Sequence, residues 1–345
     1  MKLKSTQKYF FFLILTIFSC RENSTIRRPD VSNIDIDVRI ERFDTEISNI
    51  KVDDIPSYNV KWTSKYGAFY NDFLFTMLGV GRPQDTITVN SILPQVLQKA
   101  EFKDLSAAVQ KKYPNMDRQE KELVEAFKYL KYYYPEFKVP RVITFFSGFA
   151  YQIPIGEDYV GIGLDMFLGA DSEFYPALVQ SIPLYMSRRF TPENITPRVV
   201  EALLREEFYP IPDNTRSTLQ HMLYNGKVLY ALDVILGESS DELKIGYTKE
   251  QLLWAKKYES DVWTWFMQEN LLYSTDQMRI QKYFTEAPFT PELGENNESA
   301  PKLGNYIGWM IVRKFMDKNP TLDLKDLFAI DDAQSILEGS KYKGK

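Results

Sequence analysis

The 345-residue sequence predicts an α+β fold that is mainly helical and contains a small β-sheet. Apolar residues recur at three- and four-residue steps in several segments, which is typical of helices with one buried face. Between residues 139 and 164, β-branched and aromatic runs alternate with glycine turns, as in adjacent strands. The sequence contains 22 Tyr, 23 Phe and 5 Trp, which is ample for a large core. No linker or internal repeat interrupts residues 35–340, so we expect a single domain over residues 34–345.

Residues 1–19 have the form of a lipoprotein signal peptide. Lys2, Lys4 and Lys8 precede an apolar run of about ten residues, too short for a membrane span, which needs roughly 20. The run ends in Ile-Phe-Ser-Cys at residues 17–20, the pattern of a bacterial lipobox. We therefore expect cleavage before Cys20 and lipidation of its thiol. The alternative is an ordinary cleaved signal with an incidental cysteine.

Cys20 is the only cysteine, so an exported chain has no internal disulfide to form. Each buried methylene of a lipid contributes about 0.8 kcal/mol, and two acyl chains already anchor a protein stably. The sequence thus predicts an anchored protein of the cell envelope, on the periplasmic or outer-membrane side. Residues 20–33 are polar and form the expected tether, and no further membrane helix is expected.

The mature chain is acidic. Removal of residues 1–19 takes away three lysines and leaves 39 basic against 47 acidic residues. This balance argues against a nucleic-acid partner, because such proteins carry basic patches that neutralise phosphates.

The N-terminal half is expected to contain four helical or extended segments before the sheet. Residues 34–43 alternate apolar and charged side chains, the pattern of a half-buried strand. Amphipathic helices are predicted over residues 57–77, 91–110 and 117–134, with a loop at 79–88. Tyrosines 129, 132, 133 and 134 form a cluster that suits either a carbohydrate or peptide groove or packing on the sheet.

Three adjacent strands are predicted over residues 139–146, 150–155 and 159–164. Asp165 and Asp171 follow on a turn. Their oxygens are suitable ligands for Ca²⁺, but no alternating acidic loop is present, so turn and cap roles are favoured.

A helix pair over residues 197–236, interrupted at 209–214, is the expected centre of the core. Its two buried faces contain these apolar positions: Val199, Val200, Leu203, Leu204 and Phe208 in the first helix, and Leu219, Leu223, Gly226, Tyr230 and Val234 in the second.

The order of a small sheet, a helix, a turn and a second helix is typical of zinc peptidases of the zincin type. Those enzymes bind Zn²⁺ through His-Glu-x-x-His, whose histidines at i and i+4 share one helix face. Residues 198–207 contain no histidine, and His221 is the only histidine in the chain. A two-histidine zinc site therefore cannot form. The neighbours of His221 do not suggest a Ser-His-Asp triad, whereas a pair of carboxylates for hydrolysis stays possible.

The C-terminal part of the chain is predicted to contain two packed helices joined by a loop. Residues 248–273 form a long predicted helix with a capping box at Thr248 and Gln251. Residues 287–301 have the composition of an exposed loop. A helix is predicted over residues 306–316, where Gly304 and Gly308 permit a close helix contact.

Segments 218–230, 246–254, 271–274, 287–289 and 304–316, together with Trp263, resemble the gliding-motility lipoprotein family GldB of the Bacteroidetes. The resemblance implies a cell-envelope lipoprotein that is required for gliding and works alongside the motility and type IX secretion apparatus. It also implies relationship to putative zinc peptidases in which a Glu-Gly pair follows the active-site helix. Asn225 and Gly226 stand at that pair here, so the resemblance implies a zincin-like body without its zinc ligands.

We therefore expect a non-enzymatic, zincin-like protein that binds no metal or cofactor and acts as a scaffold or binding component for other envelope proteins. The candidate binding surface surrounds the vacated metal position and contains Glu201, Glu206, Asn225 and Lys227. Tyr306 and Trp309 are either a further part of that surface or members of a buried aromatic helix. The alternatives are a carboxylate-dependent hydrolase and a peptide- or glycan-binding protein of the envelope.

Overall fold

The structure, a computed structural model, describes residues 26, 28–294, 296 and 298–345. Within these residues the protein is mainly helical and has one small sheet, which confirms the α+β prediction. The α-helices are α1 Phe43–Asn49, α2 Ile55–Tyr66, α3 Ala68–Asp72, α4 Thr86–Gln98, α5 Ala100–Lys112, α6 Asp117–Tyr133, α7 Leu184–Ser187, α8 Ile195–Leu203, α9 Thr218–Leu236, α10 Asp241–Ile245, α11 Lys249–Lys257, α12 Glu259–Gln268, α13 Gln277–Ile280, α14 Leu303–Lys318, α15 Leu324–Ala329 and α16 Ala333–Ser340.

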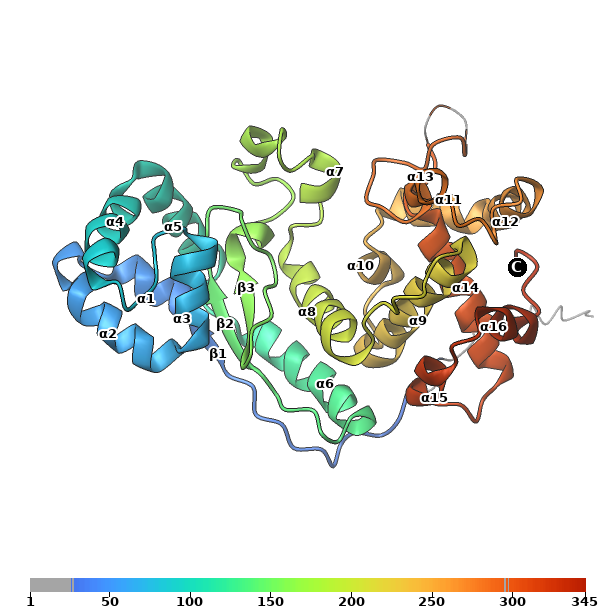
Figure 1. Cartoon of the computed structure of the whole chain (residues 1–345), viewed down its shortest axis with the longest axis horizontal. Helices are drawn as coiled ribbons and strands as arrows, with labels where there is room; N and C mark the ends of the chain where they lie inside the picture. Colours follow the sequence, from blue (N-terminus) through green and yellow to red (C-terminus); the bar gives the residue numbers. More distant parts are fainter. Residues whose placement is uncertain (1–25, 27, 295, 297) are drawn as a thin grey trace, which may run out of the picture.

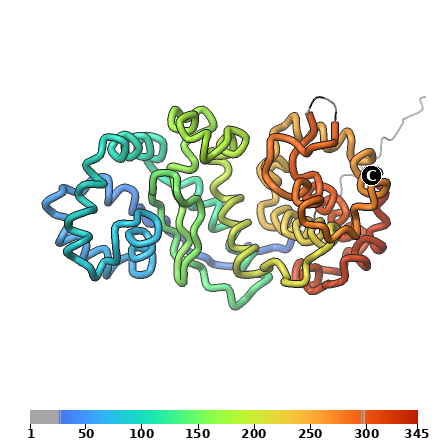
Figure 2. Tube along the Cα trace, turned by 45° about the horizontal axis from the view of Figure 1, so that its top comes forward, coloured from blue at the N-terminus to red at the C-terminus, as the bar shows by residue number. Residues whose placement is uncertain are grey.

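The molecule is elongated, and the sheet lies between two helical regions (Figure 1). Helices α1 to α5 form one end, and α9 to α16 form the other. Helices α6 and α8 lie between the sheet and the C-terminal helices. The segment before the first strand runs along one edge of the molecule from the C-terminal region to the sheet, as the turned view in Figure 2 also shows.

The sheet has three parallel strands in the order β1 Ile40–Arg42, β2 Arg141–Phe145 and β3 Tyr159–Gly163. The predicted strand over residues 34–43 is thus much shorter than expected, because only residues 40–42 find a partner strand and Phe43 already begins α1. The predicted strand over 150–155 is irregular. It lies along β3 through hydrogen bonds from the Gly161 and Gly163 amides to the carbonyls of Pro154 and Gln152.

Phe43 is the centre of the N-terminal helical region. Its ring makes edge contacts with Trp62, Tyr66, Phe69 and Phe73, at centroid distances of 5.1, 5.0, 5.3 and 4.9 Å. Such edge contacts add about 0.5–1.5 kcal/mol each to the burial of the rings. They join α1 to α2 and α3 next to the sheet.

Three predicted long helices are interrupted. The helix expected over 57–77 breaks at Gly67, which has φ +51° and separates α2 from α3. The helix expected over 91–110 breaks at Lys99, which has ψ 140°. The helix expected over 248–273 breaks at Tyr258, although its capping box at Thr248 and Gln251 is confirmed. Apolar spacing continues across all three breaks, so periodicity did not reveal them.

The core of the C-terminal region is the crossing of α9 and α14. A Cβ atom built on Gly308 would lie 1.8 Å from the carbonyl oxygen of Met222, and one built on Gly226 would lie 2.3 Å from the carbonyl oxygen of Gly308. The two helix backbones therefore approach each other more closely than any side chain would permit. The close helix contact at Gly308 is confirmed. The positions predicted to be buried are buried, except Phe208, which is half-buried. Helix α9, however, is buried on nearly all sides and not on one face alone.

Candidate functional site

Tyr306 and Trp309 lie in the core and not on a surface. Their exposed fractions are 1% and 0%. The Tyr306 hydroxyl donates to Glu259 at 2.8 Å, and the Trp309 indole N–H donates to Asp233 at 2.7 Å. Their assignment to a partner-binding patch is therefore wrong, and the alternative of a buried aromatic helix is confirmed.

Helices α8 and α9 bring Glu201, Arg205 and Asn225 together. Residues 201 and 205 share a face, although the backbone becomes π-helical over Leu204–Phe208. Arg205 Nε donates to Glu201 Oε1 at 3.0 Å, and its Nη2 donates to Asn225 Oδ1 at 3.1 Å. Burial opposes the charge of Arg205, but the carboxylate of Glu201 outweighs it and raises the pKa of the guanidinium above its usual value. A permanent cation therefore lies between the two oxygen-bearing side chains.

Lys227 also points inward. Its exposed fraction is 3%, and its Nζ donates to the Tyr209 hydroxyl at 3.1 Å and to the Ile330 carbonyl at 2.5 Å. Burial lowers the pKa of Lys227 to about 8. The ammonium thus connects α9 to the segment after α15. A binding surface would require it to face solvent, and it does not. Glu206, in contrast, is exposed.

His221 is partly buried on α9. Its ring lies 5.4 Å from the ring of Phe284, and burial lowers its pKa. Its carbonyl oxygen accepts a hydrogen bond from Asn225 Nδ2 at 2.9 Å. These contacts fit a packing role for the imidazole.

Asp165 has the turn role expected of it. The side chain is fully buried, and its Oδ2 accepts hydrogen bonds from the backbone amides of Ser147 at 3.0 Å and Phe149 at 2.7 Å. Burial raises the pKa of Asp165 to about 6. The carboxylate holds the turn after β2, where Phe149 has φ +67°.

Arg28 fastens the N-terminal segment to the body. Its Nε donates to the carbonyl of Val234 at 2.8 Å, and its Nη2 donates to that of Ile235 at 3.2 Å. A guanidinium at this position satisfies free carbonyls at the C-terminus of α9 and interacts favourably with the helix dipole. The cation also lies 4.2 Å from the ring centroid of Tyr129. The end of the expected tether is therefore packed against the body.

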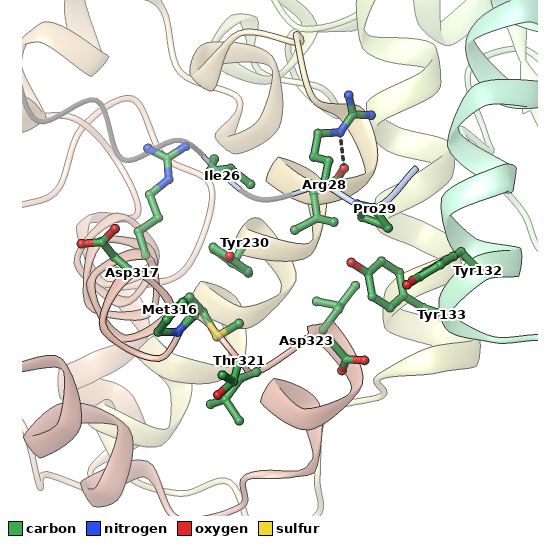
Figure 3. Close-up of a pocket in the computed structure, with 15 residues that line it drawn as sticks. Ile26, Arg28, Pro29, Tyr132, Tyr133, Tyr230, Met316, Asp317, Thr321 and Asp323 are labelled. Carbon is green, nitrogen blue, oxygen red and sulfur yellow. Dashed lines mark hydrogen bonds between the residues drawn. The ribbon is translucent and has the colours of Figure 1, made fainter. Parts of the chain in front are cut away.

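A cleft of about 760 Å³ lies beside Arg28 (Figure 3). Tyr132 and Tyr133 enter it from α6, and Met316 and Asp317 enter it from α14. Tyr132 is 47% exposed. The tyrosine cluster is visible in the sequence, but the cleft is not, because its walls come from segments that are nearly 300 residues apart in the chain.

The predicted signal peptide and Cys20 lie outside the described residues, so lipidation stays a prediction. In the part of the chain that the structure describes, no helix combines the length and the apolar character needed to cross a membrane.

A family model described as "Gliding motility protein GldB" matches residues 24–344, nearly the whole chain. The match confirms the resemblance inferred from the sequence. No curated protein and no solved structure matches the chain.

Proposed function

Because the chain belongs to the family of the gliding motility protein GldB, we propose that it is a lipid-anchored envelope protein that serves gliding as a non-catalytic binding component. In this proposal Cys20 carries the lipid and the body binds other envelope proteins of the motility or type IX secretion apparatus. The family supports the gliding role. The contacts among Glu201, Arg205 and Asn225 support the non-catalytic character.

The Glu201–Arg205–Asn225 cluster is the observation that carries this proposal. In a zincin, side chains at i and i+4 of one helix and a residue from a following helix surround the metal. Here α8 and α9 supply side chains in that arrangement, but they close around a guanidinium. Arg205 occupies Oε1 of Glu201 and Oδ1 of Asn225, and Arg198 holds the other oxygen of Glu201 at 2.6 Å, so two guanidinium groups repel any further cation. These residues do not fit Zn²⁺, and we interpret the body as a zincin-like frame whose metal position Arg205 fills.

A charge-neutral double variant, Glu201→Gln with Arg205→Gln, tests the non-catalytic role. Arg198 also pairs with Glu201, but its side chain is 19% exposed and the new glutamine oxygen at position 201 can still accept its hydrogen bond. We therefore expect cells that carry the double variant to glide, because little stability is lost and no chemistry depends on the carboxylate. Glu206→Gln, an exposed change close by, is the matched control.

The rival function, a carboxylate-dependent hydrolase, makes a different prediction. It requires the purified protein to turn over a peptide or glycan and a single Asp or Glu change to abolish that turnover. Stoichiometric zinc together with such activity, or loss of gliding in a double variant of unchanged abundance and melting temperature, would overturn the proposal.

For the partner-binding surface we propose the cleft of Figure 3 in place of the region around Lys227. Tyrosine rings supply rigid contact area together with a hydrogen-bonding hydroxyl, and they are enriched at protein interfaces. The proposed occupant is a polypeptide segment of another envelope protein, since the cleft is open and mixes tyrosines with Asp317 and Asp323.

Tyr132→Ala tests this surface, and Tyr273→Ala, at a tyrosine that is 63% exposed elsewhere, is the control. We expect the first variant, and not the second, to impair gliding and the co-purification of envelope proteins at equal abundance. Equal gliding in both variants would contradict the assignment. Stabilisation of the purified chain by a glycan would contradict the polypeptide and favour a saccharide occupant.

A further inference from the structure

Three cations and one carboxylate meet beyond the end of α7, where α10 ends and α14 begins. Arg189 and Lys302 both form ion pairs with Oε1 of Glu286. Arg188 is next to Arg189 and its Nη2 donates to the Gly246 carbonyl at 3.4 Å. We call Arg188, Arg189, Glu286 and Lys302 the Arg189 cluster. It has more positive charge than the one carboxylate neutralises.

Arg189 has two buried donor atoms on one edge of its guanidinium that lack a hydrogen-bond partner among the described residues. Its Nη1 donates to Glu286, but its Nε and Nη2 are both buried and have no partner among the described residues. This edge of a guanidinium matches the two oxygens of an oxyanion. Other arginines of this chain use the same edge to hold a carboxylate through two hydrogen bonds of 2.7–2.8 Å, in the pairs Arg42–Asp44, Arg141–Glu41 and Arg313–Asp233.

The position of this edge is fixed by the fold. Gly246 ends α10 with φ +76°, and a Cβ atom built on it would lie 2.0 Å from Arg189 Cζ. The glycine backbone therefore lies directly against the guanidinium, and only glycine fits there. Arg188 Nε is a further buried donor without a partner among the described residues. Buried donors left unpaired are costly, so the geometry indicates a missing acceptor.

Lys302 adds a second fixed cation. It is 7% exposed, and its Nζ donates to the Ile245 carbonyl at 2.9 Å and to Glu286 Oε1 at 2.6 Å. Burial, together with repulsion from Arg189, lowers the pKa of Lys302 to about 8. A negative ligand would relieve this repulsion.

Glu286 restricts the kind of anion. Its Oε2 is buried and has no partner among the described residues, so this oxygen can accept a hydrogen bond from an O–H group of the ligand. Sulfate and a carboxylate have no proton at neutral pH and would be repelled by this oxygen. A phosphate group with one O–H supplies oxygens to Arg189 and a proton to Glu286. The side chain of Glu286 is 28% exposed, so the cluster lies close to the protein surface.

We propose that the Arg189 cluster binds a singly protonated phosphate group, either free phosphate or a phosphomonoester. The Nε–Nη2 edge of Arg189 holds two phosphate oxygens, and Arg188 and Lys302 neutralise the charge. Glu286 Oε2 accepts a hydrogen bond from the phosphate O–H. This site is separate from the scaffold role and does not depend on it.

The test uses the purified full-length protein in detergent, titrated with inorganic phosphate at pH 7 and constant ionic strength. We expect saturable heat of binding and a raised melting temperature with phosphate, and neither with sulfate. Arg189→Gln is expected to weaken binding roughly ten- to hundredfold, because two charge-assisted hydrogen bonds are lost. Arg189→Lys, which keeps the charge but has no two-pronged edge, is expected to weaken it as well. Arg39→Gln, at a side chain that is 84% exposed, is the control.

Glu286→Gln tests the selectivity. Its uncharged amide can donate to an unprotonated oxyanion, so this variant is expected to bind sulfate and phosphate alike. Glycerol phosphate titrated beside inorganic phosphate at pH 6, where about half of a phosphomonoester still carries its O–H proton, distinguishes the two sources, and tighter binding of either one supports the site. Absence of saturable phosphate binding to the unmodified protein, or equal binding by both Arg189 variants and the unmodified protein, would overturn the inference.

Discussion

Asp233 is a fully buried carboxylate that connects three elements of the C-terminal region. It accepts from Lys244 at 3.0 Å and from the Trp309 indole at 2.7 Å, and Arg313 holds both of its oxygens at 2.7 Å. We expect Asp233→Ala to lower the free energy of unfolding by about 3–5 kcal/mol, because it leaves the buried ammonium of Lys244 without a carboxylate and removes one of the two carboxylates that Arg313 holds. Urea unfolding of the purified protein measures this change.

The control for Asp233 is Asp37→Ala. Asp37 pairs with Arg39 at 3.5 Å, but both side chains are about 80% exposed, and such pairs contribute little. Equal effects of the two substitutions would contradict the central role of Asp233.

Lys227 is expected to make stability depend on pH. Its folded-state pKa of about 8 lies below the ordinary value of 10.5, so the unfolded chain binds one more proton between these values. The free energy of unfolding therefore rises with pH from about 8 upward. We expect Lys227→Met to reduce this rise by about 1–2 kcal/mol between pH 8 and 9.5, measured by urea unfolding at each pH.

Two features isolate the contribution of Lys227. Burial also lowers the pKa of Lys302 to about 8. Lys302 is present in both proteins, so its contribution to the pH dependence of the free energy of unfolding cancels in the comparison. Lys121→Met, at an exposed lysine of α6, is the matched control and should keep the unmodified profile. Parallel profiles for the original protein and Lys227→Met would contradict the prediction.

At the scale of elements, the crossing of α9 and α14 requires glycine at position 308. Alanine in an unhindered helix is about 1 kcal/mol more favourable than glycine. At position 308, however, the added methyl would lie 1.8 Å from the Met222 carbonyl oxygen, which belongs to a rigid backbone. We therefore expect Gly308→Ala to lower the melting temperature and to reduce gliding through loss of folded protein. Asp317→Ala, on the exposed side of α14, should leave the melting temperature nearly unchanged. A higher melting temperature for Gly308→Ala would contradict this prediction, because it would mean that α9 and α14 can move apart without loss of stability.

At the scale of the whole molecule, Arg28 would determine how closely the body follows a lipid anchor at Cys20. Eight residues lead from Cys20 to Arg28, and an extended chain spans at most about 3.5 Å per residue. A lipidated Cys20 would thus keep Arg28, and the cleft of Figure 3 beside it, within roughly 28 Å of the membrane surface.

Arg28→Ala should release this connection. The variant loses two hydrogen bonds to the end of α9 and the contact with Tyr129, so we expect faster hydrogen exchange in residues 28–34 and at the C-terminus of α9. Arg39→Ala, farther along the same segment, should leave exchange at α9 unchanged. Unaltered exchange in Arg28→Ala would show that other contacts hold the segment.

Local sequence patterns were sufficient for the faces and starts of the helices. The spacing of Leu219, Leu223 and Val234 correctly predicted that these residues of α9 are buried, and the pair Thr248 and Gln251 identified the start of α11. Both signals lie within a few residues, and helix periodicity and capping depend on such neighbours. Composition alone likewise excludes a two-histidine zinc site, because the chain contains one histidine. The family resemblance added a role in gliding to what the local patterns indicate.

Tertiary structure alone decided which polar groups meet. Arg189 and Glu286 are far apart in the chain, as are Lys227 and Ile330, and no local pattern pairs them. The same holds for the parallel order of the strands and for the burial of Trp309, whose indole needed Asp233 as a partner. A side chain is charged or apolar by its own chemistry, but its burial and its partner depend on elements that pack from elsewhere in the chain. The sequence therefore determined which segments could form helices, and the packing of those helices determined which residues form the sites.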